Sequence, residues 1–173
     1  MSFIGIVSDE KCEKKVFSLL KEIEKSHTIL YITPANIDNM KNIKFETILI
    51  YKNSISSESL RKILQASKYL VINSDIEENL SLLQNLDLTV ITYGYNNKAT
   101  VTASSIEEDS LLLSIQRTIE SVSKVKYEPQ EIKAYVPEKI LEQNIYKIMG
   151  EIILILLYGK QNNVENISEK PDK

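Results

Sequence analysis

The sequence has few of the residues on which many sites and scaffolds depend. Its 173 residues include one cysteine, one histidine, four glycines and no tryptophan. The single cysteine, Cys12, excludes an internal disulfide and any metal site built from cysteines alone. The single histidine, His27, leaves little from which to build a zinc site or a Ser-His-Asp triad. The sequence therefore predicts no metal and no cofactor.

Long apolar runs and an excess of positive charge are also missing. The longest apolar run, residues 152–158, is far short of the roughly 20 residues that a membrane-spanning helix needs. The net charge of −3 and the isoelectric point of about 5.4 argue against a general nucleic-acid-binding protein. The apolar N-terminus turns acidic at Asp9 and has no basic region or cleavage site, so it does not read as a signal peptide. We expect a cytoplasmic protein with no membrane span and no nucleic-acid partner.

What is present suits one globular domain. With 43% hydrophobic and 26% charged residues, the chain is apolar enough to bury a core. Short apolar runs alternate with helical patterns, and such runs are typical of strands covered on both faces. We expect strands over residues 3–7, 28–33, 47–51, 69–73 and 88–93, and helices over residues 10–25, 57–67 and 76–84. This alternation predicts an α/β fold with three layers, in which helices cover both faces of a doubly wound, mostly parallel sheet.

The pattern changes after Gly94. Residues 99–105, 110–116 and 131–136 are strand candidates, and the alternation of apolar and polar side chains among them predicts a small antiparallel extension. A long helix from Pro137 to Gly159 is expected to close the fold, because proline is favoured in a first turn and glycine just after a last one. We expect a single domain over residues 1–159 and a disordered polar tail over residues 160–173.

Three stretches place polar residues at the ends of strands or at the start of a helix. Residues 71–75 read Val-Ile-Asn-Ser-Asp and residues 90–94 read Val-Ile-Thr-Tyr-Gly. Residues 143–147 read Gln-Asn-Ile-Tyr-Lys, and residues 3–7 read Phe-Ile-Gly-Ile-Val before a loop and an apolar helix. In this order they resemble the strand ends, the last helix and the first strand of the central ATP-binding domain of the Mur ligase family. The resemblance implies an α/β fold and, by analogy of fold alone, a role near bacterial cell-envelope synthesis.

The departures from that family lie in the residues that would bind ATP. A phosphate loop needs glycines so that backbone N–H groups face the phosphates, with a lysine for charge and a hydroxyl for magnesium. Residues 8–15 read Ser-Asp-Glu-Lys-Cys-Glu-Lys-Lys, which has no glycine and would point acids at a triphosphate. Lys147 stands where the family's second asparagine recognises the base, and a lysine can only donate hydrogen bonds. We therefore expect a protein without catalytic activity.

The same stretches supply candidates for a residual ligand site. These are Ser8, Lys11, Asn73, Asp75, Asn144 and Lys147. Three of the candidates also have a structural interpretation. Ser8 suits a helix cap, Asp75 has the spacing of a capping box with Glu78, and Asn144 suits the start of a buried helix.

A phospho-receiver domain is a rival interpretation for a chain of this size. Asp9 and Glu10 fit the paired acids that such a domain has after its first strand. Lys52 and Gly94 stand near the positions where it needs an aspartate and a lysine, so the match fails there.

The expected last helix carries the candidate interface. A helix that is apolar on every side must be buried on every side. The candidate interface residues are Ile152, Ile153, Leu156 and Leu157, and the alternative is that they line the central helix of the fold. The predicted function is a non-catalytic, Mur-ligase-like binding or interaction module that acts on a protein partner or a second copy of itself. The alternatives are a regulator with a weak nucleotide or small-anion pocket and an enzyme of another class that uses the same cleft.

Overall fold

A computed structural model describes residues 2–8, 18–52, 55, 57–136 and 144–159. The strands are β1 (Phe3–Val7), β2 (Thr28–Ile32), β3 (Phe45–Ile50), β4 (Tyr69–Asn73), β5 (Thr89–Gly94), β6 (Val101–Ile106), β7 (Ser110–Ile115), β8 (Ile119–Glu120), β9 (Lys126–Tyr127) and β10 (Gln130–Tyr135). The α-helices are α1 (Lys21–Glu24), α2 (Ile37–Met40), α3 (Ser57–Gln65), α4 (Glu77–Leu80) and α6 (Ile145–Tyr158), and the 3₁₀ helices are η2 (Ser18–Leu20) and η3 (Ser81–Leu83).

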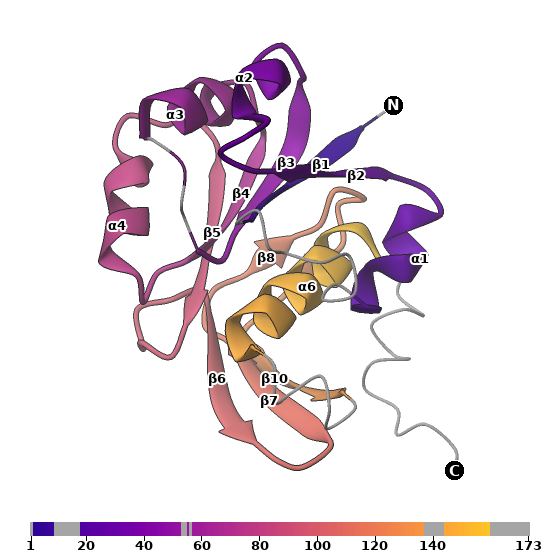
Figure 1. Ribbon diagram of the computed structural model, residues 1–173. Helices are drawn as coiled ribbons and strands as arrows, with labels where there is room; N and C mark the ends of the chain where they lie inside the picture. Colours follow the sequence, from indigo (N-terminus) through magenta and orange to yellow (C-terminus); the bar gives the residue numbers. More distant parts are fainter. Residues whose placement is uncertain (1, 9–17, 53–54, 56, 137–143, 160–173) are drawn as a thin grey trace.

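One eight-stranded sheet organises the fold (Figure 1). Its strand order is β10-β7-β6-β5-β4-β3-β1-β2, and β8 pairs with β9 separately. Pairing is parallel from β2 across to β6 and antiparallel between β6, β7 and β10. The parallel part has the order 2-1-3-4-5 that is found in flavodoxin-like doubly wound sheets. In that order the direction of winding reverses between β1 and β3, and ligands of such sheets bind at the carboxyl ends of the strands beside that point.

Helices cover both faces of the parallel strands, so the three-layer α/β prediction is confirmed. Figure 1 shows α2, α3 and α4 on one face and α1 and α6 on the other. Strand β3 illustrates the reason, since successive side chains point to opposite faces of a sheet. Leu49 packs in the cluster that contains α6, whereas its neighbours Ile48 and Ile50 pack in the cluster that contains α3. A strand that is apolar at consecutive positions therefore needs a helical layer on each side.

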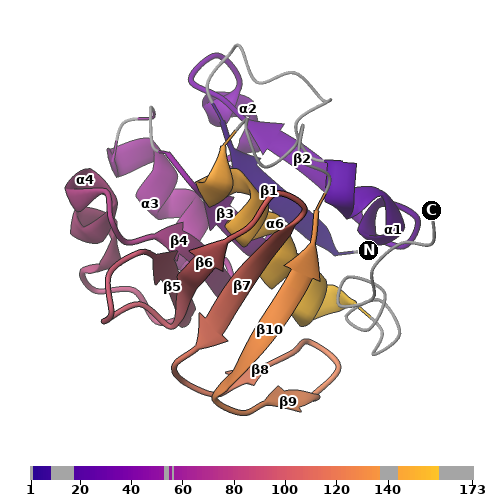
Figure 2. The ribbon, with the colours of Figure 1, turned by 90° about the horizontal axis from the view of Figure 1, so that it is seen from below.

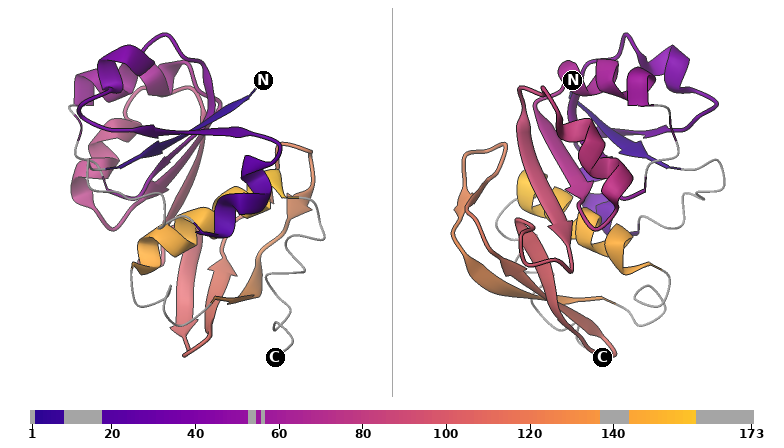
Figure 3. Two further views of the ribbon diagram at one scale, coloured as in Figure 1. Left: turned by 45° about the vertical axis from the view of Figure 1, so that its right-hand side comes forward. Right: turned by 90° about the vertical axis from the view of Figure 1, so that its left-hand side faces the viewer.

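The antiparallel strands form the far wall of the α6 compartment. Figure 3 shows α6 between the parallel strands and the curved part of the sheet formed by β6, β7 and β10. Leu111, Leu113 and Ile132 from this wall belong to the same buried cluster as the α6 side chains. The small β8–β9 ribbon is attached to the end of α6, because the N–H of Val122 donates to the carbonyl of Leu157 at 2.9 Å. Strands β6, β7 and β10 are continuous with the parallel strands in one sheet, whereas the β8–β9 ribbon is a separate sheet.

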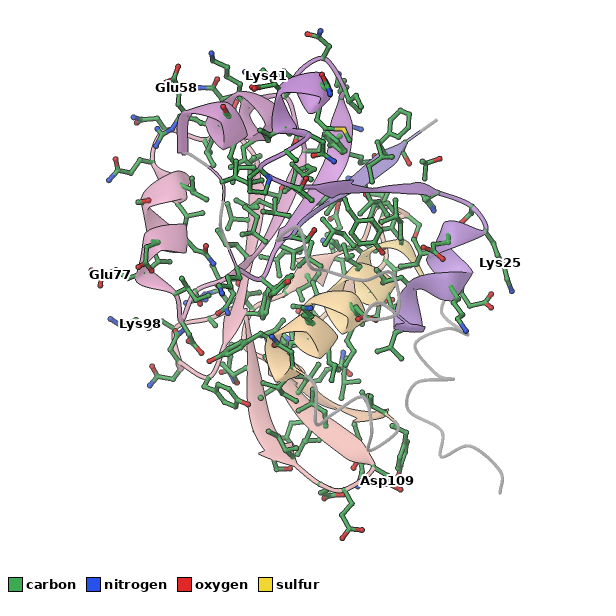
Figure 4. All side chains as sticks on the ribbon, in the orientation of Figure 1. Lys25, Lys41, Glu58, Glu77, Lys98 and Asp109 are labelled. Carbon is green, nitrogen blue, oxygen red and sulfur yellow. The ribbon has the colours of Figure 1, made fainter. Side chains whose placement is uncertain are left out.

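Charged side chains lie mostly at the periphery. In Figure 4 the labelled Lys25, Glu58 and Asp109 all point outward from the ribbon. Surface pairs such as Lys62 with Glu58, one helical turn apart at 3.6 Å, are highly exposed. Exposed pairs of this kind add little stability, so the two apolar clusters carry most of the fold's stabilisation.

The predicted strands agree with the structure to within two residues at each end. The expected helix over residues 10–25 is described only for its last part, as η2 and α1, and the rest lies outside the described residues. The expected helix over residues 76–84 is divided into α4 and η3. Helix α2 and the β8–β9 ribbon were not predicted.

The last helix differs from its prediction at the N-terminal end. A continuous helix from Pro137 is wrong, because Asn144 has extended backbone angles (φ −169°, ψ 104°) and is the N-cap of α6. Gly159 follows the last turn, and its N–H donates to the carbonyl of Ile155 at 2.6 Å. Residues 137–143 and the predicted tail over residues 160–173 lie outside the described residues.

The predicted interface on α6 is enclosed by the chain itself. Ile152 and Leu156 are 1% exposed, and Ile153 and Leu157 are fully buried. A second subunit cannot contact side chains that are buried within one chain, so the prediction that these four form an interface is wrong and they line the central helix. No helix in the described part of the chain is long and apolar enough to cross a membrane.

Candidate functional site

The candidate ligand residues gather at one edge of the sheet, where β1, β3, β4 and β5 end and α6 begins (Figure 1). Ser8 follows β1, Asn73 ends β4, and Asn144 and Lys147 open α6. Ser8 is 1% exposed, and its N–H donates to the carbonyl of Ile32 at 2.9 Å. That N–H extends the β1–β2 pairing, and it does not point to an open phosphate site. Lys11 lies outside the described residues.

Asn73 ties the ends of two neighbouring strands together. Its buried side-chain amide donates to the carbonyl of Tyr51 after β3 at 3.2 Å, and its Oδ1 accepts from the N–H of Asp75 at 3.0 Å. Its backbone carbonyl accepts from the side-chain amide of Asn79 in α4 at 2.8 Å. An asparagine with these partners holds the strand ends in register and has few groups left for a ligand.

Asp75 is the centre of the edge. Its Oδ2 accepts from the backbone N–H of Tyr95 at 2.6 Å and from the hydroxyl of Tyr146 at 3.0 Å. Its Oδ1 accepts from the backbone N–H and the side-chain amide of Asn96, at 3.2 and 2.6 Å. This one carboxylate therefore joins the end of β4, the loop after β5 and the first turn of α6. We call these four residues, Asp75, Tyr95, Asn96 and Tyr146, the Asp75 clasp.

The clasp sets the charge state of its members. Partial burial by itself raises the pKa of Asp75, but the hydrogen bonds from Tyr95, Asn96 and Tyr146 outweigh it and hold that pKa below its ordinary value. Burial, followed by the hydrogen bond to Asp75, raises the pKa of the Tyr146 hydroxyl to about 12. A carboxylate with a lowered pKa and four donors is a weak base. The clasp is therefore suited to holding segments together and poorly suited to proton abstraction.

Gly94 makes the close approach inside the clasp possible. A Cβ added at this position would collide with the carboxylate of Asp75. The Thr-Tyr-Gly end of β5 thus has a packing reason that involves no nucleotide, since only a residue without a side chain lets the next two N–H groups reach Asp75.

The start of α6 uses the other two candidates. Oδ1 of Asn144 accepts from the N–H groups of Tyr146 and Lys147 at 3.0 and 3.3 Å, which is the usual role of an N-cap asparagine. The ammonium of Lys147 lies 4.8 Å from the ring centroid of Tyr51, a cation–π distance. Lys147 thereby places positive charge at the carboxyl end of β3, beside the point where the winding of the sheet reverses.

The capping-box interpretation of Asp75 is wrong. Helix α4 begins at Glu77 with Ile76 as its N-cap, and no side chain caps it. The hydroxyl of Ser74 instead donates to the carbonyl of Tyr93 at 3.2 Å. Tyr95, Asn96 and Tyr146 were not among the sequence candidates. Their contacts to Asp75 span about 20 to 71 residues, so a local spacing rule could not find them.

A second polar feature, Glu151, is enclosed in the apolar layer around α6. Its side chain is fully buried, and Oε2 accepts from the N–H of Leu19 at 2.9 Å. Among the residues that the structure describes, Oε1 has no hydrogen-bond partner. Burial raises the pKa of Glu151 to about 8, and the N–H of Leu19 and the charge of Lys147 only partly oppose this. The sequence does contain a signal for this group, because Glu151 is a single acid within an apolar helical pattern, but Glu151 was not among the sequence candidates.

Neither metal ligation nor a known family supplies a further assignment. Within the described ranges, no group of three or more His, Cys, Asp or Glu side chains is placed to hold a metal ion. The sequence matches no protein-family model, and a search of curated proteins gives no match. The resemblance to the Mur ligase central domain stays a prediction.

Proposed function

We propose that this chain is a non-catalytic binding or interaction module, Mur-ligase-like in origin, that works in the bacterial cytoplasm. The Asp75 clasp carries the proposal. Asp75 occupies the strand end where an α/β enzyme would present a catalytic or metal-binding acid. Its two oxygens accept four hydrogen bonds from Tyr95, Asn96 and Tyr146. A carboxylate whose oxygens already accept these hydrogen bonds stabilises the edge of the sheet. A binding partner would then be recognised by the surface of the domain.

The strand end after β1 supports the same conclusion. An anion cradle needs successive backbone N–H groups that are free to face phosphate oxygens. The N–H of Ser8 is already bonded to Ile32, and the sequence after it begins with the acids Asp9 and Glu10 and has no glycine up to residue 15. The partner of such a module would be another protein or a second copy of this chain.

A nucleotide screen tests the proposal. ATP, ADP and UDP-sugars at millimolar concentration are added in a thermal-shift assay, and ATP hydrolysis is followed in parallel. We expect no change in Tm with any nucleotide and no turnover above a buffer control. A rise in Tm of several degrees with a nucleotide would favour the regulator described next, and turnover that is lost in Asp75→Asn would overturn the non-catalytic assignment.

The second candidate is a regulator with a weak nucleotide or small-anion pocket. The observation that favours it is the ammonium of Lys147 beside Tyr51 at the carboxyl end of β3. Inorganic phosphate added to the thermal-shift assay would then raise Tm in the wild type and not in Lys147→Gln. Lys62→Gln is the matched control, because Lys62 is an exposed lysine on α3, on the opposite face of the sheet. Equal responses of all three proteins to phosphate would remove this candidate.

A further inference from the structure

Strand β10 ends the eight-stranded sheet on one side, as Figure 2 shows. It pairs with β7 in an unbroken antiparallel register, and the N–H of Val136 donates to the carbonyl of Asp109 at 2.9 Å. In such a pairing the backbone groups of every second residue face the neighbouring strand. Those of Ala134 and Ile132 therefore face β7, and those of Glu131 and Lys133 face away from the sheet. Within the described part of the chain, no residue bonds to these outward groups of Glu131 and Lys133.

The charged side chains along β10 are complementary to those of a second, antiparallel copy of the same strand. Consider two copies of β10 that pair antiparallel, with the two-fold axis through Ile132. Glu131 of one copy then lies directly opposite Lys133 of the other, and the symmetry repeats this contact. The same register lets the outward N–H and C=O groups of the two residues exchange four backbone hydrogen bonds. An axis through Lys133 would instead place two lysines opposite each other, so the charges favour the Ile132 register.

The side chains are positioned for this contact. Glu131 is exposed, and the side chain of Lys133 is 41% exposed. The ammonium of Lys133 already pairs with Glu107 at 2.7 Å. A glutamate from a second copy would extend this pair into a three-charge network, and Ile132, which is 8% exposed, would meet its own copy on the inner face.

The opposite edge of the sheet is less suitable. At β2 the outward carbonyl of Tyr31 accepts from the side-chain amide of Asn36 at 2.9 Å. Oδ1 of Asn36 accepts from the N–H of Thr33 at 2.8 Å. The side chain of Asn36 therefore covers the end of β2 and shortens the length of strand that another chain could pair with.

We propose that β10 is a self-association surface, on which a second copy of this chain pairs antiparallel with Ile132 at the two-fold axis. The inference deepens the proposed function, on which it rests, by naming the partner as the chain itself. The contact is one strand wide, so the dimer is weak and depends on protein concentration. Like charges on a strand edge normally prevent two strands from pairing there. This edge carries one negative residue, Glu131, and one positive residue, Lys133. An antiparallel second copy therefore places the opposite charge beside each of them.

Charge reversal at the edge tests the pairing. Sedimentation velocity from micromolar to millimolar concentration should give a mass that rises towards that of a dimer. Glu131→Lys and Lys133→Glu place like charges opposite each other, and each should dimerise on the order of tenfold more weakly than wild type. An equimolar mixture of the two variants restores opposite charges and should form a heterodimer. Glu131→Lys is the primary variant, because Lys133→Glu also removes the pair with Glu107.

The control variant reverses an exposed pair elsewhere, Glu120→Lys with Lys124→Glu, and should sediment like wild type. Far-UV circular dichroism checks that every variant is folded, and Glu131→Gln provides a milder change. A wild type that stays monomeric at all concentrations would overturn the inference, as would a mixture that gives no heterodimer. Neither result touches the proposed lack of catalysis, which fails only if the hydrolysis assay is positive.

Discussion

Replacing Glu151 by glutamine should raise the stability of the protein at pH 8 and leave it nearly unchanged near pH 4.5. In the wild type, burial raises the pKa of the Glu151 carboxyl from 4.5 to about 8, and the N–H of Leu19 and the charge of Lys147 only partly oppose it. The glutamine amide has nearly the same shape, still offers an oxygen to the N–H of Leu19, and does not ionise. The variant therefore isolates the free energy of ionising one buried carboxyl.

The sign and size follow from proton linkage. Below pH 4.5 the carboxyl is protonated in both the folded and the unfolded chain, so its ionisation has no effect on stability. As the pH rises towards 8, the unfolded chain releases this proton while the folded chain retains it. The free energy of unfolding then falls by about 1.4 kcal/mol per pH unit. Over the whole window the loss is about 4–5 kcal/mol, which is a large part of the roughly 5–15 kcal/mol that stabilises a typical domain.

The assay is urea unfolding at several pH values between about 5 and 8, followed by far-UV circular dichroism because the chain has no tryptophan. The quantity of interest is the difference in unfolding free energy between Glu151→Gln and wild type, in which the other titrating groups cancel. This difference should grow with pH. Glu58→Gln is the control for the change from carboxyl to amide, since the Glu58 side chain is 87% exposed. A constant difference for Glu151→Gln would refute the argument that burial keeps this carboxyl protonated.

Three further substitutions test the packing of the site and of α6 by urea unfolding. Asp75→Asn places an amide NH₂ group opposite hydrogen-bond donors. The free energy of unfolding should therefore fall at neutral pH by about 1–2 kcal/mol, a value that already allows for the partial exposure of the clasp. Because the folded pKa of Asp75 is lowered, this loss should shrink as the pH falls through that pKa. Gly150→Ala should destabilise by about 1–3 kcal/mol, since the new Cβ would lie 2.8 Å from Leu49 Cδ1, whereas at an exposed helical site the same change would stabilise. Leu156→Ala should cost about 2–5 kcal/mol and leave the sedimentation behaviour unchanged, and a lower dimer affinity would revive the discarded α6 interface.

The strands could be predicted because burial on two faces leaves a mark in the sequence itself. Residues 48–50 and 70–72 are apolar at every position, and the structure has β3 and β4 there. The helix boundaries were harder, because they depend on which side chain satisfies the first N–H groups. Asn144 caps α6 through contacts two and three residues away, so the local sequence did contain that signal. The continuous helix from Pro137 was predicted because the apolar spacing extended past this cap.

The structure brings four of the candidate ligand residues together, and their role as a ligand site stays a prediction. Asn73, Asp75, Asn144 and Lys147 do lie at one edge of the sheet, as parallel strand order requires. Their roles could not be predicted, because the partners of Asp75 come from a loop and a helix that the chain reaches about 20 and 71 residues later. The interface prediction failed for a related reason. Apolarity on all sides of α6 predicts complete burial, but it does not say whether the same chain or another one buries the helix.

The sequence alone determined where the strands of the main sheet lie and that this sheet needs cover on both faces, since these follow from periodicity and from the need to remove apolar area from water. It also determined that a phosphate loop of the usual kind is missing. Only the tertiary structure decided that Asp75 holds three segments together, that Glu151 is sealed in an apolar layer, and that β10 presents its outward backbone groups at an edge. Hydrogen bonds and burial between distant segments depend on distances in space, and spacing along the chain does not encode those distances.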